Sequence, residues 1–431
     1  MNGEEEGQLL NVPVERHRLP NGLRVTLSLD RSVPIVAVNL WYGVGSRNER
    51  SGRTGFAHLF EHMMFQGSAN VPKNRHFELV EQAGGSLNAS TWFDRTNYYE
   101  TLPSHHLELA LWLESDRMGW MLPAMTQEKL ENQQGVVKNE RKERYDNQPY
   151  GDWDERMQAL VFPPDHPYHH SVIGSMEDIG AATLEDVAEF FRTFYVPNNA
   201  VLTLAGDFDP DDALGLIETY FGEIPEGAPI PPLPGNEEIP PVIGEMVAEE
   251  VIGNVPLPRV YLGARVPPLT DEGFHTADVA ATVLGGGKAS RLYRSLVREK
   301  RVAKDVLAYL FPLQTGASLL LFWITGYPGA DPDTLRGALL GELEGLGSVT
   351  DGELNRAAAL TETHLIRSIQ QVGTRADLLS MFDQTFDDPG RLNSEVERVR
   401  AVTKAQVRKF GQEFLGSENR AFLTYVPGEG Q

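Results

Sequence analysis

Apolar and polar positions in the first half of the chain follow two different periods. Leu23–Ser28, Ile35–Tyr42 and Asn97–Leu102 are short runs of strand type, whereas His76–Ala83 and His106–Met118 carry apolar residues at helical spacing. The strand-type runs are short and alternating instead of uniformly apolar, which favours mixed sheets with helices on one side. The pattern therefore predicts an α+β fold.

A proline-rich stretch interrupts this pattern near the middle of the chain. Residues 225–241 contain seven prolines, which lack the N–H group that regular pairing needs. Such a composition indicates an extended, semi-rigid connection. We therefore expect two domains, 1–224 and 242–431, joined by a linker at 225–241.

The two halves also share a weak repeat. Helix-like stretches followed by strand-like runs (200–205 and 420–425) have matching residues at equal spacing: Thr183, Val187, Phe194 and Leu202 against Thr403, Val407, Phe414 and Phe422. Chance similarity between unrelated α+β segments is the alternative explanation. We favour two homologous α+β domains, each a mixed, mostly antiparallel sheet covered by helices.

Composition narrows the function classes. The 431 residues include 38 basic and 61 acidic side chains, a net charge of −23, and no cysteine. The negative charge argues against nonspecific binding to nucleic acid or to anionic membranes. Without cysteine, a metal site must use His, Asp or Glu. Met1–Leu10 does not resemble a secretory signal and no run is long enough to span a membrane, so we expect a cytoplasmic protein.

The strongest chemical signal lies in Thr54–Gly67, which reads TGFAHLFEHMMFQG. On a helix, His58 and His62 lie one turn apart and can share one tetrahedral metal. Glu61 lies beside that face and could act as a general base toward a water whose pKa the metal lowers to about 7. The alternative is an ordinary core helix with two satisfied histidines. Two histidines also leave the site one ligand short, because catalytic zinc usually takes three protein ligands.

These residues resemble a known family. His58-x-x-Glu61-His62 is similar to the inverted zinc motif of the pitrilysin/insulysin metallopeptidases. The flanking sequence resembles the branch of mitochondrial processing peptidase and its bacterial relatives. The resemblance extends over most of the chain, through GVGSRNE (43–49), GGSLNASTWFDRTNYYETLP (84–103), VVKNERKERYDNQPYG (136–151), HPYHHSVIG (166–174) and FYVPNNAVLTLAGDF (194–208).

The resemblance implies roles for individual residues. It makes His58 and His62 zinc ligands, Glu61 the base and Glu140 the third ligand, chosen over Glu131 and Glu143 by the VVKNE match alone. Some relatives carry an acid two helical turns before this ligand. Here Gln133 stands at that position, and its amide could orient the ligand by hydrogen bonding.

The strand-like stretch Asn88–Tyr99 is rich in threonine and aromatic residues. An exposed edge there could bind an extended peptide as an additional strand, and the resemblance puts that edge at Asn88 and Ala89. An ordinary sheet strand is the alternative.

The second half lacks the metal residues. Ala277, Ala280 and Ala281 stand where histidines and base would be, which predicts a domain without a metal site. The family uses an Arg and a Tyr, about two turns apart, to hold substrate. This chain has Arg298, but Asp305 takes the Tyr position, and a carboxylate would repel a developing oxyanion. We therefore expect a homodimer or a heterodimer, in which a homologous non-metal subunit would supply the Arg/Tyr pair.

The sequence thus predicts a zinc-dependent endopeptidase for unfolded peptides or extended protein segments. A non-catalytic structural or assembly subunit of the same family is one alternative, and a metal-dependent hydrolase of small molecules is another. A second metal site at His166, His169 and His170 is a further possibility.

Overall fold

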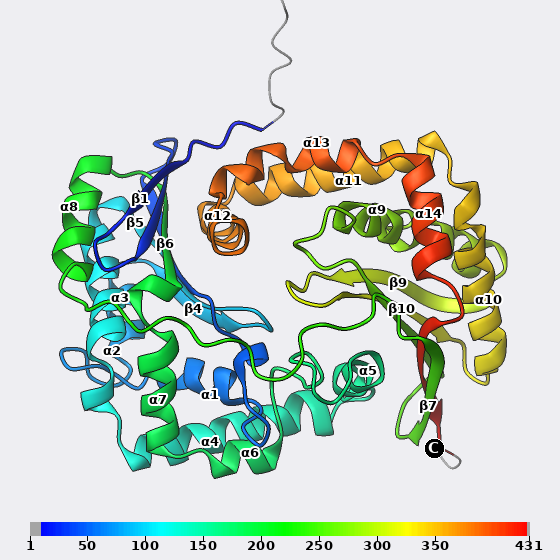
Figure 1. Ribbon diagram of the computed structural model, residues 1–431, viewed down its shortest axis with the longest axis horizontal. Coiled ribbons are helices and arrows are strands. Elements are labelled where there is room, and N and C mark those ends of the chain that lie inside the picture. Colours follow the sequence, from blue (N-terminus) through cyan, green and yellow to red (C-terminus); the bar gives the residue numbers. More distant parts are fainter. Residues whose placement is uncertain (1–9, 429–431) are drawn as a thin grey trace, which may run out of the picture. The chain divides into compact units, whose positions relative to one another are not determined.

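The computed structural model describes residues 10–428 (Figure 1). The chain packs into two compact units. Unit 1 takes the residues up to Arg141 together with Val172–Pro234 and Leu365–Glu395. Unit 2 takes Lys142–Ser171, Gly235–His364 and the residues from Val396 onward. Each unit therefore includes a segment from the other half of the chain, whereas the sequence predicts the continuous domains 1–224 and 242–431.

Unit 1 is built on a six-stranded sheet in the order β1-β2-β6-β3-β5-β4 within the described residues. The strands are β1 (Glu15–Arg18), β2 (Arg24–Leu29), β3 (Ile35–Tyr42), β4 (Ser86–Thr91), β5 (Thr96–Pro103) and β6 (Ala200–Gly206). β2 and β6 are parallel and the other neighbours are antiparallel. β4 ends the sheet, so one of its edges has no strand partner among residues 10–428.

Helices cover both faces of this sheet. α1 (Phe56–Met63), α2 (Arg75–Gln82) and α3 (Leu107–Trp120) pack on one face, and α12 (Val372–Phe386) crosses β2, β6 and β3 on the other. Successive side chains along each strand point to opposite faces, so one sheet can pack against helices on both sides. Ala37 and Ala205 contact Val372 and Ala376 of α12, while Tyr42 points to the opposite core and packs against Tyr195.

Polar contacts fix α12 to the sheet. The fully buried carboxylate of Asp383 accepts hydrogen bonds from Thr26 (2.8 Å) and from Arg24 (3.2 Å). Asp377 accepts from Asn39 (3.2 Å) and Asn97 (2.9 Å). A helix from the second half of the chain is therefore a structural layer of unit 1.

Unit 2 contains a five-stranded sheet in the order β7-β11-β8-β10-β9. The strands are β7 (Glu245–Gly253), β8 (Arg259–Val266), β9 (Ala303–Phe311), β10 (Ser318–Gly326) and β11 (Asn419–Pro427), and only β11 and β7 pair in parallel. α9 (Phe274–Gly285), α10 (Pro332–Glu344) and α14 (Lys404–Phe414) enclose the main hydrophobic core on one face. On the opposite face, Trp153 of α5 (Trp153–Val161) stacks on Tyr261 at 5.4 Å, so α5 is the first half's contribution to unit 2.

The predicted fold class, two α+β domains with mixed, mostly antiparallel sheets, is confirmed. The expectation of helices on one side only is wrong, because α12 and α5 cover the second face of the sheets in units 1 and 2. The repeat is visible in the helix caps, because Thr183 begins α7 (Leu184–Phe194) and Thr403 begins α14 with the same capping box, and β6 and β11 follow. Residues 225–241 form neither helix nor strand. The stretch Asn88–Tyr99 is a hairpin instead of one strand, since Trp92 N–H donates to Arg95 C=O (2.8 Å) and turns β4 into β5.

Over residues 10–428, every helix is too short or too polar to cross a membrane.

Candidate metal centre

α1 presents two chemically different sides. Its apolar residues are buried: Phe56, Ala57, Leu59, Phe60 and Met63. Phe60 packs on Tyr195 with ring centroids 4.3 Å apart. Helical periodicity leaves His58, Glu61 and His62 on the other, half-buried side, as the sequence predicts.

α4 (Gln127–Arg141) supplies the facing side chain. Leu130, Gln133 and Val137 are buried along one stripe of this helix, and Glu140 continues the same stripe one turn later. Gln134 anchors α4 by donating to the carbonyls of Ile179 and Ala182, each at 2.9 Å. The stripe therefore directs Glu140 toward α1, which α4 contacts.

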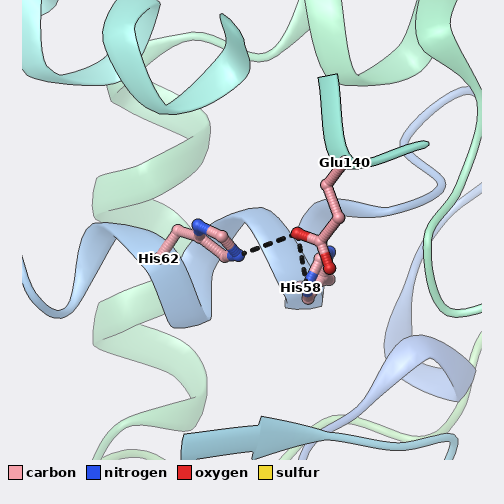
Figure 2. Close-up of side chains that lie close together, drawn as sticks. All are labelled: His58, His62 and Glu140. Atoms are coloured by element: carbon pink, nitrogen blue, oxygen red, sulfur yellow. Dashed lines mark ion pairs between the residues drawn. The ribbon is translucent and has the colours of Figure 1, made fainter. Parts of the chain in front are cut away.

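The three predicted ligands meet. Glu140 Oε2 lies 3.8 Å from His58 Nε2 and 3.5 Å from His62 Nε2, and Figure 2 shows the carboxylate pointing at both imidazole rings. One ligand atom from each of the three residues lies within 4.8 Å of the others. In the described part of the chain, this is the one group of three or more His, Asp or Glu residues with such spacing.

The geometry fits zinc. Ligands about 2.0–2.2 Å from a tetrahedral zinc lie about 3.3–3.6 Å from one another. The distances from Glu140 Oε2 to the two imidazole nitrogens, 3.8 and 3.5 Å, are close to this range. Two imidazoles and a carboxylate are also a donor set of catalytic zinc sites, in which the fourth position stays open. His58, His62 and Glu140 are therefore the residues that would hold the ion.

Glu61 has the surroundings of a general base. Burial raises the pKa of its carboxyl, while a hydrogen bond from Thr91 and the charges of His62 and Arg95 oppose that shift. Thr91 Oγ1 donates to Glu61 Oε2 at 2.5 Å. A carboxylate with a raised pKa is suited to accept and return a proton near neutral pH.

Gln133 lies within hydrogen-bonding distance of His62. Burial lowers the pKa of His62, but hydrogen bonds from His62 to Glu140 and Gln133 and the charges of Glu61 and Glu140 outweigh it and raise the pKa. The buried amide of Gln133 therefore contacts a ligand without adding negative charge.

The alternative acids lie elsewhere. Exposed Glu131 accepts from Gln127 (2.9 Å), and Glu143 lies on the π-helical turn Lys142–Asp146. His166 is buried against Phe162, and burial lowers its pKa to about 4. Within residues 10–428, neither these acids nor His166, His169 and His170 belong to a cluster with metal-ligand spacing.

The predicted substrate residues occupy different elements. Asn88 is exposed and Ala89 is buried, and both lie on the edge strand β4. In unit 2, Arg298 lies on the π-helix η6 (Tyr293–Glu299), and Asp305 lies on β9. Asp305 accepts hydrogen bonds from Trp323 (3.2 Å) and Thr325 (2.9 Å) of β10, so its carboxylate is part of the sheet.

Sequence reasoning missed two residues that support α1. Thr91 lies two positions after Ala89, on the same side of β4, but the contact with Glu61 spans 30 residues. Glu49 ends the GVGSRNE segment, and its buried carboxylate accepts from the N–H groups of Gly55 (2.9 Å) and Ala57 (2.7 Å). An acidic residue shortly before an uncapped helix is the signal that could have identified Glu49.

Two family models match the chain. "Insulinase (Peptidase family M16)" matches residues 24–158, and "Peptidase M16 inactive domain" matches residues 181–360. The second range contains α9, which carries Ala277, Ala280 and Ala281.

Curated relatives agree with these matches. "Zinc protease PqqE" of Helicobacter pylori is 31% identical over 378 residues, which cover 86% of this chain and 81% of the relative. "Mitochondrial-processing peptidase subunit beta" of Blastocladiella emersonii is 28% identical over 98% of this chain and 91% of its own length.

Solved structures share the fold. A protease from Helicobacter pylori has a TM-score of 0.89 and 27% identity, covering 96% of this chain and 100% of that one. An M16 inactive domain from Pseudomonas fluorescens has a TM-score of 0.83 over 97% of this chain and 99% of its own, at 18% identity, which supports the fold alone.

Proposed function

This chain belongs to peptidase family M16, and from that premise we propose that it is a zinc-dependent endopeptidase acting on unfolded peptides or extended protein segments. The matches to the two family models and to the zinc protease of Helicobacter pylori confirm the family that the zinc motif indicates. The observation that carries the proposal is the convergence of His58, His62 and Glu140 beside the carboxylate of Glu61.

The proposed mechanism assigns a role to each group. Bound zinc would polarise the scissile carbonyl and increase the acidity of water. Glu61 accepts a proton from the attacking water and then delivers it to the nitrogen of the leaving amine. The edge of β4 that has no strand partner among the described residues, at Asn88 and Ala89, binds the peptide. It does so through backbone hydrogen bonds, which tolerate many side-chain sequences.

We also propose that the chain works as a dimer, with itself or with a homologous subunit that supplies an Arg/Tyr pair. Asp305 supports this, since its carboxylate stands where a phenol is expected and is bonded to β10. Full turnover by the purified chain alone, unchanged by any homologue, would contradict the heterodimer.

A comparison of the wild type with Glu61→Gln tests the catalytic proposal. Glutamine keeps the size of the side chain but cannot accept the proton, so kcat should fall about 10²- to 10⁴-fold while bound zinc per chain is unchanged. Turnover is measured with an unfolded protein and with a quenched fluorescent peptide, and zinc by metal analysis. Glu131→Gln, an exposed acid on α4, is the matched control and should behave as the wild type.

The same measurements address the alternatives. A non-catalytic subunit would show no turnover in either protein, and equal turnover by the wild type and Glu61→Gln would remove Glu61 from the mechanism.

A further inference from the structure

We propose that Thr91 is a positioning residue that fixes the carboxylate of Glu61 relative to the peptide-binding strand β4. This inference rests on the proposed function. Thr91 is the last residue of β4, and its hydroxyl donates to Glu61 Oε2 at 2.5 Å across the space between the sheet and α1. The side chain that contacts the proposed base therefore belongs to the strand that would bind the substrate.

The hydrogen bond restrains a side chain that is otherwise adjustable. A glutamate has three rotatable bonds, and only a defined orientation of its carboxylate presents an oxygen to the attacking water. A bond from a hydroxyl to an ionised carboxylate is stronger than a neutral one. Because Oε2 of Glu61 accepts the hydrogen bond from Thr91, Oε1 is the oxygen that accepts the proton from water. The β-branched side chain of threonine is stiff, so the direction of the hydroxyl is itself fixed.

The hairpin that carries Thr91 is firmly attached. In the turn between β4 and β5, Asp94 pairs with Arg47 at 2.9 Å, and the C=O groups of Trp92 and Phe93 accept from the N–H groups of Ser46 (3.2 Å) and Arg47 (3.0 Å). A Cβ at Gly45 would lie 2.3 Å from the carbonyl oxygen of Trp92, so the loop approaches the hairpin closely.

The same loop holds the other partner of the hydrogen bond. The carboxylate of Glu49 accepts hydrogen bonds from N–H groups at the start of α1, the helix that carries Glu61. One loop therefore contacts both the hairpin and α1. The hydrogen bond from Thr91 to Glu61 is a second, direct contact between these two elements, and it lies at the proposed base. The offset between the base and the strand is set by these contacts before any peptide binds. A displacement of about 1 Å at such a site can cost about 10²-fold in rate.

Two substitutions of Thr91 distinguish a role in positioning Glu61 from a purely structural role. Thr91→Val keeps the shape of the side chain and removes the hydroxyl, and Thr91→Ser keeps the hydroxyl. In the zinc-loaded chain of 431 residues, kcat of Thr91→Val should fall about 10- to 100-fold at unchanged KM, and Thr91→Ser should restore most of it. The zinc dissociation constant, measured by chelator competition, should be the same in all three proteins. Thr193→Val, on α7, removes a hydroxyl bonded to its own helix and serves as the control.

The outcomes separate this inference from the proposed function. Wild-type kcat in Thr91→Val, or equal impairment of Thr91→Ser and Thr91→Val, would overturn the role of Thr91 and leave the peptidase in place. An inactive wild type, or a fully active Glu61→Gln, would remove both proposals.

Discussion

Two histidines of unit 1 experience opposite environments. His62 is half-buried beside Glu140, and although burial lowers its pKa, its acidic neighbours raise it overall. His76 on α2 is fully buried, and this burial, together with the charge of Arg117, lowers its pKa to about 3. The first ring is paired with an acid at the candidate metal centre, whereas the second is a neutral part of the core.

The depressed pKa of His76 predicts a loss of stability in acid. The unfolded side chain takes up a proton below pH about 6.5, while the folded one stays neutral down to about 3, so the stabilisation present above pH 6.5 is lost as the pH falls between these values. From pH 6 to pH 4 this amounts to about 2–3 kcal/mol of unfolding free energy. Urea unfolding of the metal-free protein at both pH values should show a correspondingly smaller loss for His76→Gln than for the wild type. An identical loss in both proteins would contradict the assignment.

At the residue scale, the sequence predicted those parts of the site that are local. His58, Glu61 and His62 occupy one helix, so their spacing alone brings them together. Glu140 could be chosen over Glu131 and Glu143 only by the family resemblance, because no local rule states which acid of a charged helix faces α1. Thr91 was missed, since its hydroxyl reaches Glu61 through tertiary packing.

Among the elements, α1 depends on support from outside its own sequence. Its N-cap is Gly55, with φ at 79° and no side-chain cap. Glu49 accepts hydrogen bonds from two of the N–H groups at the start of the helix, those of Gly55 and Ala57. A buried carboxylate at a helix N-terminus also interacts favourably with the helix dipole. The orientation of the metal-binding helix is therefore set by the preceding loop.

Removal of this carboxylate should weaken both the helix and the metal site. In Glu49→Ala the two N–H groups lose a charged acceptor, which should lower the unfolding free energy by about 2–3 kcal/mol and weaken zinc binding. Denaturant melts and chelator competition measure the two effects. Glu189→Ala, which removes an exposed acid paired with Arg50, should change both by little. A Glu49→Ala protein with wild-type stability and zinc affinity would contradict this role.

Several elements followed from hydrophobic periodicity, because each is a local response to its pattern. The predicted run Ile35–Tyr42 coincides with β3, and the helices at 76–83 and 106–118 correspond to α2 and α3. The hairpin at 88–99 was missed because its turn, Trp92–Arg95, lacks the glycine or asparagine that usually marks one.

At the scale of the whole molecule, the chain exchanges helices between its halves. α12, from the second half, covers a face of the unit 1 sheet, and α5, from the first half, covers a face of the unit 2 sheet. The proline-rich linker identified the midpoint of the chain but not this exchange, because the apolar face of α12 does not specify which sheet it will cover. The two halves are therefore not separate folding units.

This exchange predicts the behaviour of a truncated chain. A fragment of residues 10–234 lacks α12, exposes Ala37 and Ala205, and leaves Thr26 and Asn39 without their acidic partners. It should melt without a cooperative transition, and a peptide of residues 365–395 added in trans should restore one. The same peptide with Ala376→Asp, which puts a charge against the sheet, should fail to do so. Cooperative melting of the fragment alone, followed by circular dichroism, would contradict the exchange.

The zinc site is tested most directly by locating the metal in a crystal of the zinc-loaded 431-residue chain, by anomalous scattering at the zinc edge. We expect one strong peak per chain, about 2.0–2.2 Å from His58 Nε2, His62 Nε2 and the Glu140 carboxylate, with Glu61 not coordinated. No peak in unit 1, or a peak whose ligands exclude Glu140, would contradict it.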